Sequence, residues 1–125
     1  MIEFKYSKKL PFIFISNELS AKYNVLGCYV DKANRAIASL EGTNPILDGH
    51  YRSRVNQIEK CYKVSLSLGY KVFAIQDDGQ CFGSVEAEKT YNKYGLSTGC
   101  NGGKGGSMAS SVYKIVEGKY NLFEN

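Results

Sequence analysis

The 125-residue sequence has no tryptophan, two prolines and a single histidine, and its four cysteines include no CxxC pair. A structural zinc site normally draws on close ligand pairs, because two thiolates on one tight turn can reach the same ion. That class of site is therefore not expected. Residues 10–15 form an apolar run that is far too short to cross a bilayer, so no membrane insertion is expected either.

The sequence also lacks a block of one charge. Sixteen basic and twelve acidic residues give a net charge of +4, and the densest basic group, Arg52, Arg54, Lys60 and Lys63, is interrupted by Glu59. Nucleic-acid binders usually concentrate positive charge on one face or helix, so nucleic acid is not an expected partner.

No motif for nucleotide, calcium or catalytic chemistry is complete. The glycine-rich segment 99–107 has the wrong register for a phosphate loop, because Thr98 stands where the first glycine is needed and Gly105 follows Lys104. The acidic residues Glu41, Asp48, Asp77 and Asp78 could ligate calcium but have no EF-hand spacing. Cys81 has no suitable base, since His50 precedes it. We therefore expect no cofactor or metal and no enzymatic activity.

What the chain does contain favours a turn-rich α+β fold. It has 13 glycines, ten tyrosines and six phenylalanines, a composition typical of short strands joined by turns. We expect a small, mainly antiparallel sheet packed on one main helix, with long loops. Residues 1–22, an N-terminal extension or extra strand, precede a single module over 23–125. Three lysines, Lys5, Lys8 and Lys9, precede the apolar run 10–15 in the order of a signal peptide, but a strand at residues 12–15 is the preferred interpretation.

The main helix is predicted over residues 56–68. Asn56 and Glu59 have the spacing of a capping box, and Gly69 can close the helix in a left-handed conformation. Helical periodicity places Ile58, Cys61, Val64 or Ser65, and Leu68 on the apolar face. The other predicted elements are strands at 23–30, 70–76, around 81–82 and at 111–116, a tight turn at 77–79, a short helix between Ser84 and Tyr94, and an irregular loop over 31–54.

The four separated cysteines predict two disulfides and hence an oxidising, extracellular environment. Four reduced thiols in a cytosolic domain are the alternative. Of the three possible pairings we choose Cys61 with Cys81, because the hairpin after Gly69 must fold back against the helix face that carries Cys61. Cys28 then pairs with Cys100.

The loop over 31–54 is the best candidate for a binding surface. Sugars are held by aromatic faces and by planar carboxylate, amide and guanidinium groups, and tyrosine offers a large contact area with little rotamer entropy to lose. The alternative is that the same residues hold the loop together through ion pairs and hydrogen bonds. The candidate ligand-binding residues are Arg35, Glu41, Asp48, Tyr51, Arg52 and Arg54.

A series of short motifs resembles the WSC domain. They are GCY at 27–29, Asp31, Arg35-Ala36, a helix with a cysteine, GYKVFAIQ at 69–76, QCFG at 80–83 and SVY at 111–113. The LEG and LDGHY stretches at 40–42 and 47–51 are similar to divergent WSC-like modules of secreted fish and cnidarian proteins. The chain departs from the family in having four cysteines, where eight are common, and Phe82 in place of a tryptophan.

The resemblance implies a small sheet packed on one helix, PAN/apple-like in outline, and an extracellular role in binding glycans or matrix. The expected function is a secreted, lectin-like carbohydrate-binding module. The alternative is a protein-binding adhesion or structural module of an extracellular matrix.

Overall fold

The computed structural model describes residues 22–116, so the predicted strand at residues 12–15 lies outside the described part. Within the described part, residues 25–115 form one compact unit, and residues 22–24 and 116 belong to another. The amide of Val116 donates a hydrogen bond to the carbonyl of Lys22. The unit over residues 25–115 carries nearly all of the described secondary structure.

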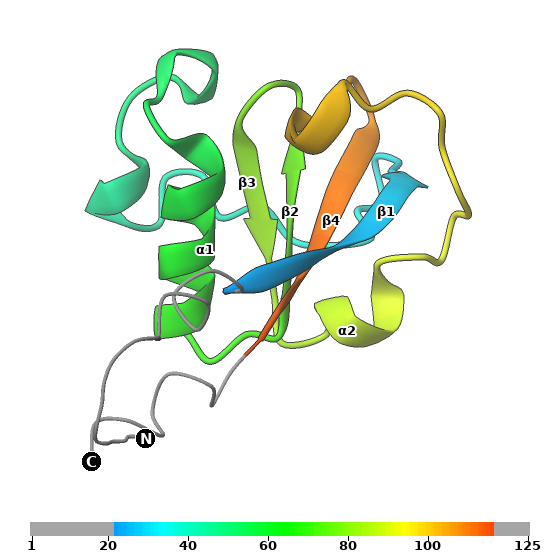
Figure 1. Cartoon of the computed structure of the whole chain (residues 1–125), viewed down its shortest axis with the longest axis horizontal. Coiled ribbons are helices and arrows are strands. Elements are labelled where there is room, and N and C mark those ends of the chain that lie inside the picture. The colour runs from blue at the N-terminus through cyan, green and yellow to red at the C-terminus, as the bar shows by residue number, and fades with distance from the viewer. Residues whose placement is uncertain (1–21, 117–125) are drawn as a thin grey trace, which may run out of the picture. The chain divides into compact units, whose positions relative to one another are not determined.

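Four strands form one antiparallel sheet, as predicted (Figure 1). They are β1 (Tyr23–Val30), β2 (Val72–Gln76), β3 (Gln80–Gly83) and β4 (Ala109–Ile115), in the order β1-β4-β2-β3. The main helix α1 (Gln57–Ser67) precedes β2, and the short helix α2 (Ala87–Thr90) follows β3. The expected α+β, disulfide-stabilised fold class is therefore confirmed.

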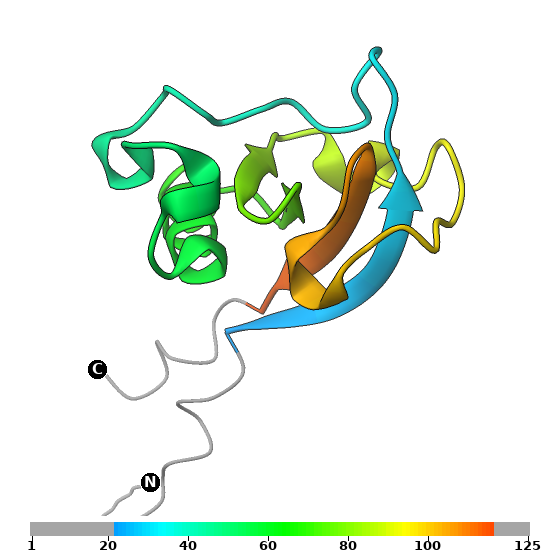
Figure 2. The ribbon, with the colours of Figure 1, turned by 90° about the horizontal axis from the view of Figure 1, so that it is seen from above.

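Strand β2 is buried along its whole length because both faces of the sheet are covered there. On one face Phe73 pairs with Tyr113 of β4, their rings stack at 5.0 Å, and Tyr62 of α1 lies against Phe73. Figure 2 shows α1 beside β2 and β3. On the other face the side chains of β2, β3 and β4 meet the loop after β1 and helix α2. That core contains Ala36, Ile37, Val72, Ala74, Phe82, Ala87 and Val112.

Both predicted disulfides are present. Cys61 of α1 is bonded to Cys81 of β3, and neither residue has any exposed surface. Cys28 of β1 is bonded to Cys100 in the segment before β4, and both of these residues are half-buried. One bond thus lies in the core between α1 and the sheet, and the other ties an outer strand to a loop.

The start of α1 differs from the prediction. Asn56 has a left-handed backbone, with φ of 56°, and its side chain makes no capping hydrogen bond, so the capping-box prediction is wrong. Asparagine is one of the few residues that adopts this conformation readily. The other end behaves as predicted, since Gly69 is left-handed with φ of 78°. Leu68, however, is half exposed and does not extend the apolar face.

Helix α2 is much shorter than the predicted helix from Ser84 to Tyr94. The reason is tertiary pairing after the helix. The amide of Val30 donates to the carbonyl of Gly95, and the amide of Ser97 donates to the carbonyl of Cys28. The chain must therefore leave the helical path before Gly95 to run beside β1.

The glycine-rich segment is a closely packed connector. A Cβ atom on Gly105 would lie 2.2 Å from the carbonyl oxygen of Ile75, and Gly105 has a φ of 68°. Only glycine fits this approach to the end of β2 without a shift of the backbone. Within residues 22–116, no helix is long and apolar enough to cross a membrane.

Candidate functional site

The charged residues of the loop over 31–54 separate into an interior group and a surface group. Arg54 and Glu41 form the interior pair, called the anchor pair here. Both terminal nitrogens of Arg54 donate to the Glu41 carboxylate, at 2.9 and 2.6 Å, and the Arg54 side chain is only 1% exposed. A bidentate guanidinium–carboxylate pair of this kind is strong and geometrically specific.

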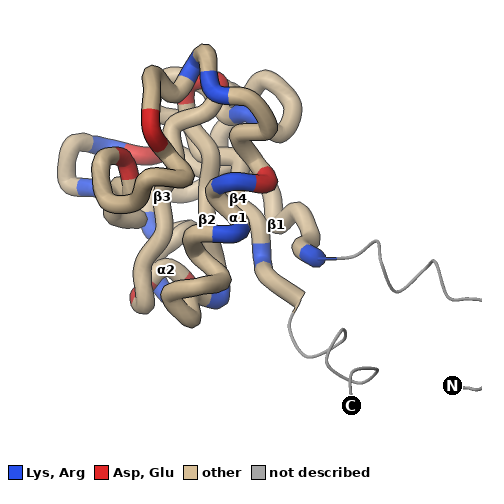
Figure 3. The backbone as a smooth tube through the Cα atoms, turned by 90° about the vertical axis from the view of Figure 1, so that its left-hand side faces the viewer, with Lys and Arg blue, Asp and Glu red and all other residues tan. Residues whose placement is uncertain are grey.

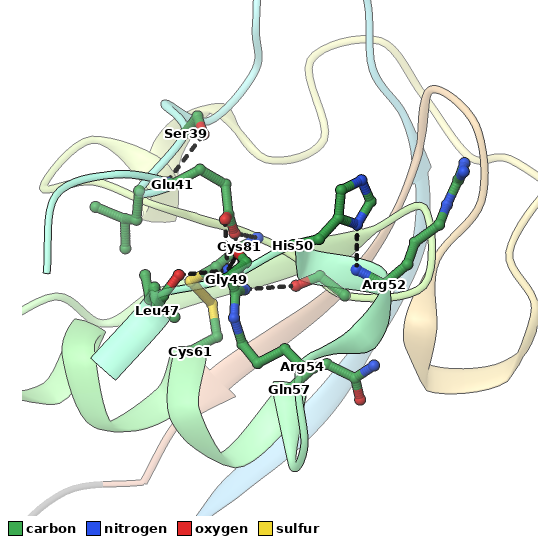
Figure 4. A network of polar contacts seen from close by, with 12 residues as sticks. Ser39, Glu41, Leu47, Gly49, His50, Arg52, Arg54, Gln57, Cys61 and Cys81 are labelled. Carbon is green, nitrogen blue, oxygen red and sulfur yellow. Dashed lines mark hydrogen bonds and ion pairs between the residues drawn. A yellow bond between two sulfur atoms is a disulfide. The ribbon is translucent and has the colours of Figure 1, made fainter. Parts of the chain in front are cut away.

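The anchor pair also satisfies four backbone groups, two in the loop and two in the β2–β3 hairpin (Figure 4). Arg54 donates to the carbonyls of Leu47, Gly49 and Gly79. Glu41 accepts a hydrogen bond from the amide of Cys81 at 2.7 Å, on the outer edge of β3. Together these contacts hold the loop against the β2–β3 hairpin. Because Arg54 is buried and engaged with the protein itself, it has no free surface for a ligand.

Arg35 belongs to a second, separate network. It donates to the carboxylate of the buried Asp31, which also accepts hydrogen bonds from the Gln76 side chain and the Ala36 amide. Burial raises the pKa of Asp31, but the hydrogen bonds from Ala36, Arg35 and Gln76 outweigh it and hold the pKa below its usual value. Arg35 thus positions the start of the loop.

Asp48 is exposed. Its amide donates to the carbonyl of Pro45, closing a single turn of 3₁₀ helix, while its carboxylate makes no hydrogen bond or ion pair with any described residue. The side chain is therefore available to solvent.

The surface group is formed by Tyr51, Arg52 and Asp77, called the tip cluster here. The hydroxyl of Tyr51 donates to one oxygen of Asp77 at 3.0 Å, and Arg52 donates to both oxygens at 2.6 Å. The Arg52 side chain is 55% exposed. The imidazole of His50 stacks on the Tyr51 ring with the centroids 4.6 Å apart.

These contacts shift the ionisation of all three members of the tip cluster. Arg52 hydrogen-bonds the carboxylate of Asp77 and lowers its pKa. The same contact raises the pKa of Arg52, and the hydrogen bond to Asp77 raises the pKa of Tyr51. At neutral pH the cluster therefore holds a carboxylate, a guanidinium and a neutral phenol in one fixed arrangement.

Neighbouring backbone groups fix the position of the tip cluster. Gly79 passes so close that a Cβ atom there would lie 2.3 Å from the carbonyl oxygen of Tyr51. The side chain of Gln57 donates to the carbonyl of Asp78, and the Asp78 amide donates to the carbonyl of Lys104. The imidazole of His50 accepts a hydrogen bond from the amide of Arg52. The cluster is consequently pre-organised before any ligand arrives.

The arrangement offers binding chemistry. An aromatic pair, the Arg52–Asp77 ion pair and the exposed carboxylate of Asp78 lie near the turn that joins β2 to β3. Among residues 22–116, no three His, Cys, Asp or Glu side chains gather into a group that could hold a metal ion. The acidic residues that the sequence suggested for calcium are divided, since Glu41 faces Arg54 and Asp77 faces Arg52.

The structure thus brings Tyr51 and Arg52 together, places Glu41 and Arg54 beneath them, and leaves Arg35 in another network. The contribution of Asp77 to this surface was not predicted, because the sequence identified it only as part of a turn and as a possible calcium ligand. Its one available signal was the pair of acidic residues at a hairpin tip, which says nothing about which loop packs beside it.

Comparison with known proteins adds no family. No protein-family model matches this chain, and no curated protein matches it significantly.

Proposed function

We propose that this protein is an extracellular, non-catalytic carbohydrate-binding module in which the tip cluster contacts the sugar. The observation that carries the proposal is the fixed Tyr51–Arg52–Asp77 arrangement at an exposed turn. Sugar C–H faces pack on aromatic rings, while carboxylate and guanidinium groups bind sugar hydroxyls.

Pre-organisation favours this function. Tyr51 is half-buried and held by its hydroxyl, so little side-chain entropy remains to be lost when a ligand binds. Arg52 uses one terminal nitrogen for Asp77, which leaves other donors of the exposed guanidinium for sugar hydroxyls.

The proposed extracellular location is supported by the two disulfides, because such bonds persist mainly in oxidising compartments. The resemblance of the motifs to the WSC domain supports a role in glycan binding, and the observed sheet packed on one helix agrees with the outline that this resemblance implies.

The second candidate is a protein-binding adhesion or matrix module. It is favoured by exposed apolar side chains at the β1 side of the sheet, where Val25 is 69% and Leu96 is 77% exposed. Exposed apolar groups of this kind are typical of protein-contact surfaces when they are contiguous.

A glycan array probed with the full, disulfide-bonded chain tests the proposal. We expect specific signals that are lost in Tyr51→Ala and retained in Lys63→Ala, a change at an exposed position on α1. An array silent for the wild type, together with specific binding to a matrix protein, would transfer the assignment to the second candidate.

A further inference from the structure

Two lysines from distant parts of the chain approach one tyrosine ring, that of Tyr94, outside the tip cluster. The Nζ atom of Lys32, which follows β1, lies 4.9 Å from the ring centroid of Tyr94. The Nζ atom of Lys93, which follows α2, lies 5.1 Å from the same centroid. Both lysines are exposed. Because both distances run to the same centroid, the two nitrogens lie no farther apart than the sum of these distances.

The Tyr94 ring that both lysines approach is fixed in place. Tyr94 packs partly against the core on this face of the sheet, and its hydroxyl donates to the carbonyl of Asn34 at 2.5 Å. The hydroxyl of Thr90 ties α2 to the carbonyl of Ala36 in the same loop. The segments that carry Lys32 and Lys93 are thus joined, so their convergence does not depend on the lysine side chains alone.

The positive charge at this place is not neutralised. Neither lysine forms an ion pair with any residue in the described part of the chain, and Glu86 and Glu88 near α2 form none there either. The nearby carboxylate of Asp31 is already engaged by Arg35 and Gln76. Both ammonium groups are therefore available to an anion that binds beside the ring, and their positive charges would add in attracting it.

We propose that Lys32, Tyr94 and Lys93 bind a sulfate or carboxylate group of an acidic glycan. The two ammonium groups donate charge-assisted hydrogen bonds to the anion, and the exposed part of the ring contacts the C–H face of the adjoining sugar. The inference rests on the proposed function and extends it to acidic sugars through a second contact region.

The pattern of charge favours a glycan over a nucleic acid. A nucleic-acid surface needs a stripe of cations that follows successive phosphates. Here the lysines gather at one ring, and Figure 3 shows the other Lys and Arg positions spread over several elements.

Calorimetric titration of the full, disulfide-bonded chain tests the inference. The probes are a heparin hexasaccharide, a hyaluronan hexasaccharide whose only anions are carboxylates, neutral chitohexaose and a hexathymidylate. The test variant is Lys32→Gln/Lys93→Gln. The matched control is Lys60→Gln/Lys63→Gln, which removes the same charge from two neighbouring positions on α1.

We expect the test variant to lose about tenfold in affinity for the heparin hexasaccharide, and the control to lose about twofold or less. If the test variant loses affinity for the heparin hexasaccharide but not for the hyaluronan hexasaccharide, the site binds sulfate. If it loses affinity for both, the site accepts either anion. Equal losses in the test and control variants, no loss in either, or tighter binding of hexathymidylate would overturn the inference.

The two proposals can fail separately. Loss of heparin binding in the test variant with no effect of Tyr51→Ala on any sugar supports this inference and contradicts the tip-cluster site. If sugar binding is lost in Tyr51→Ala but unchanged in the lysine variant, the tip-cluster site is supported and the lysine site is contradicted.

Discussion

The tip cluster and the anchor pair contain the same chemistry, an arginine with a carboxylate, and their arginines are only two residues apart in the chain. Arg54 is 1% exposed and binds three backbone carbonyls, two in the loop and one in the β2–β3 turn, besides Glu41. Arg52 is 55% exposed, and among the described residues its guanidinium makes hydrogen bonds to Asp77 alone. The anchor pair therefore holds the loop in place, whereas the arginine and carboxylate of the tip cluster lie on the surface of that loop.

The largest effect is expected from Arg54→Ala. This change leaves Glu41 and several backbone carbonyls without their donor, so we expect the free energy of unfolding to fall by about 3–5 kcal/mol. Urea denaturation measures the loss. The matched change Arg52→Ala should cost about 1 kcal/mol or less, because its ion pair is exposed. Equal losses in the two variants would remove the distinction between the two pairs.

The disulfides give a second comparison between interior and surface. The chain-entropy estimate assigns about 3 kcal/mol to Cys61–Cys81 and about 4.5 kcal/mol to Cys28–Cys100, which closes the longer loop. Ease of reduction should follow exposure instead, so Cys28–Cys100 should open first.

Stepwise reduction with alkylation and peptide mapping by mass spectrometry tests that order. We expect a species with Cys28 and Cys100 alkylated and the other bond intact, followed by loss of structure at stronger reductant. Opening of Cys61–Cys81 first would show that the core around α1 is less protected than its burial indicates.

Acid should destabilise the protein through its carboxylates of lowered pKa. A carboxylate whose folded pKa is depressed contributes stability above its unfolded pKa, about 3.9, and that contribution is lost as the pH falls through the folded value. Asp31 and Asp77 both meet this condition. Because Asp31 is buried and Asp77 is not, Asp31→Asn should remove more of the acid dependence than Asp77→Asn.

Urea midpoints measured at pH 6 and pH 3 for both variants provide the check. If Asp77→Asn flattened the pH dependence more than Asp31→Asn, the exposed Arg52–Asp77 pair would contribute more to folding than the buried Asp31, which would contradict this expectation.

Local patterns predicted much of the fold. The cysteine pairing followed from the buried face of α1 and the hairpin after Gly69, both of which are short-range features. The sequence predicted where α1 starts to within one residue, but not the backbone conformation of Asn56, because asparagine suits both a capping conformation and the left-handed one that it adopts.

The sequence also could not predict which charged residues of the loop are buried and which are exposed. Glu41 and Arg54 look like surface charges in the chain, and only their packing against β3 and the hairpin turn makes them interior. Tyr51 and Arg52 were predicted as binding residues, but their partner Asp77 lies on another element. Long-range packing of an irregular loop leaves no periodic signal.

Of the changes considered, Arg52→Ala should have the smallest effect on stability and the clearest effect on sugar binding. A glycan array is probed with the wild type and with Arg52→Ala, after thermal unfolding has shown similar Tm values for both. The tip-cluster assignment predicts wild-type signals for specific sugars that are absent in Arg52→Ala. Identical signals for both proteins, or silence of the wild type across the array, would contradict it.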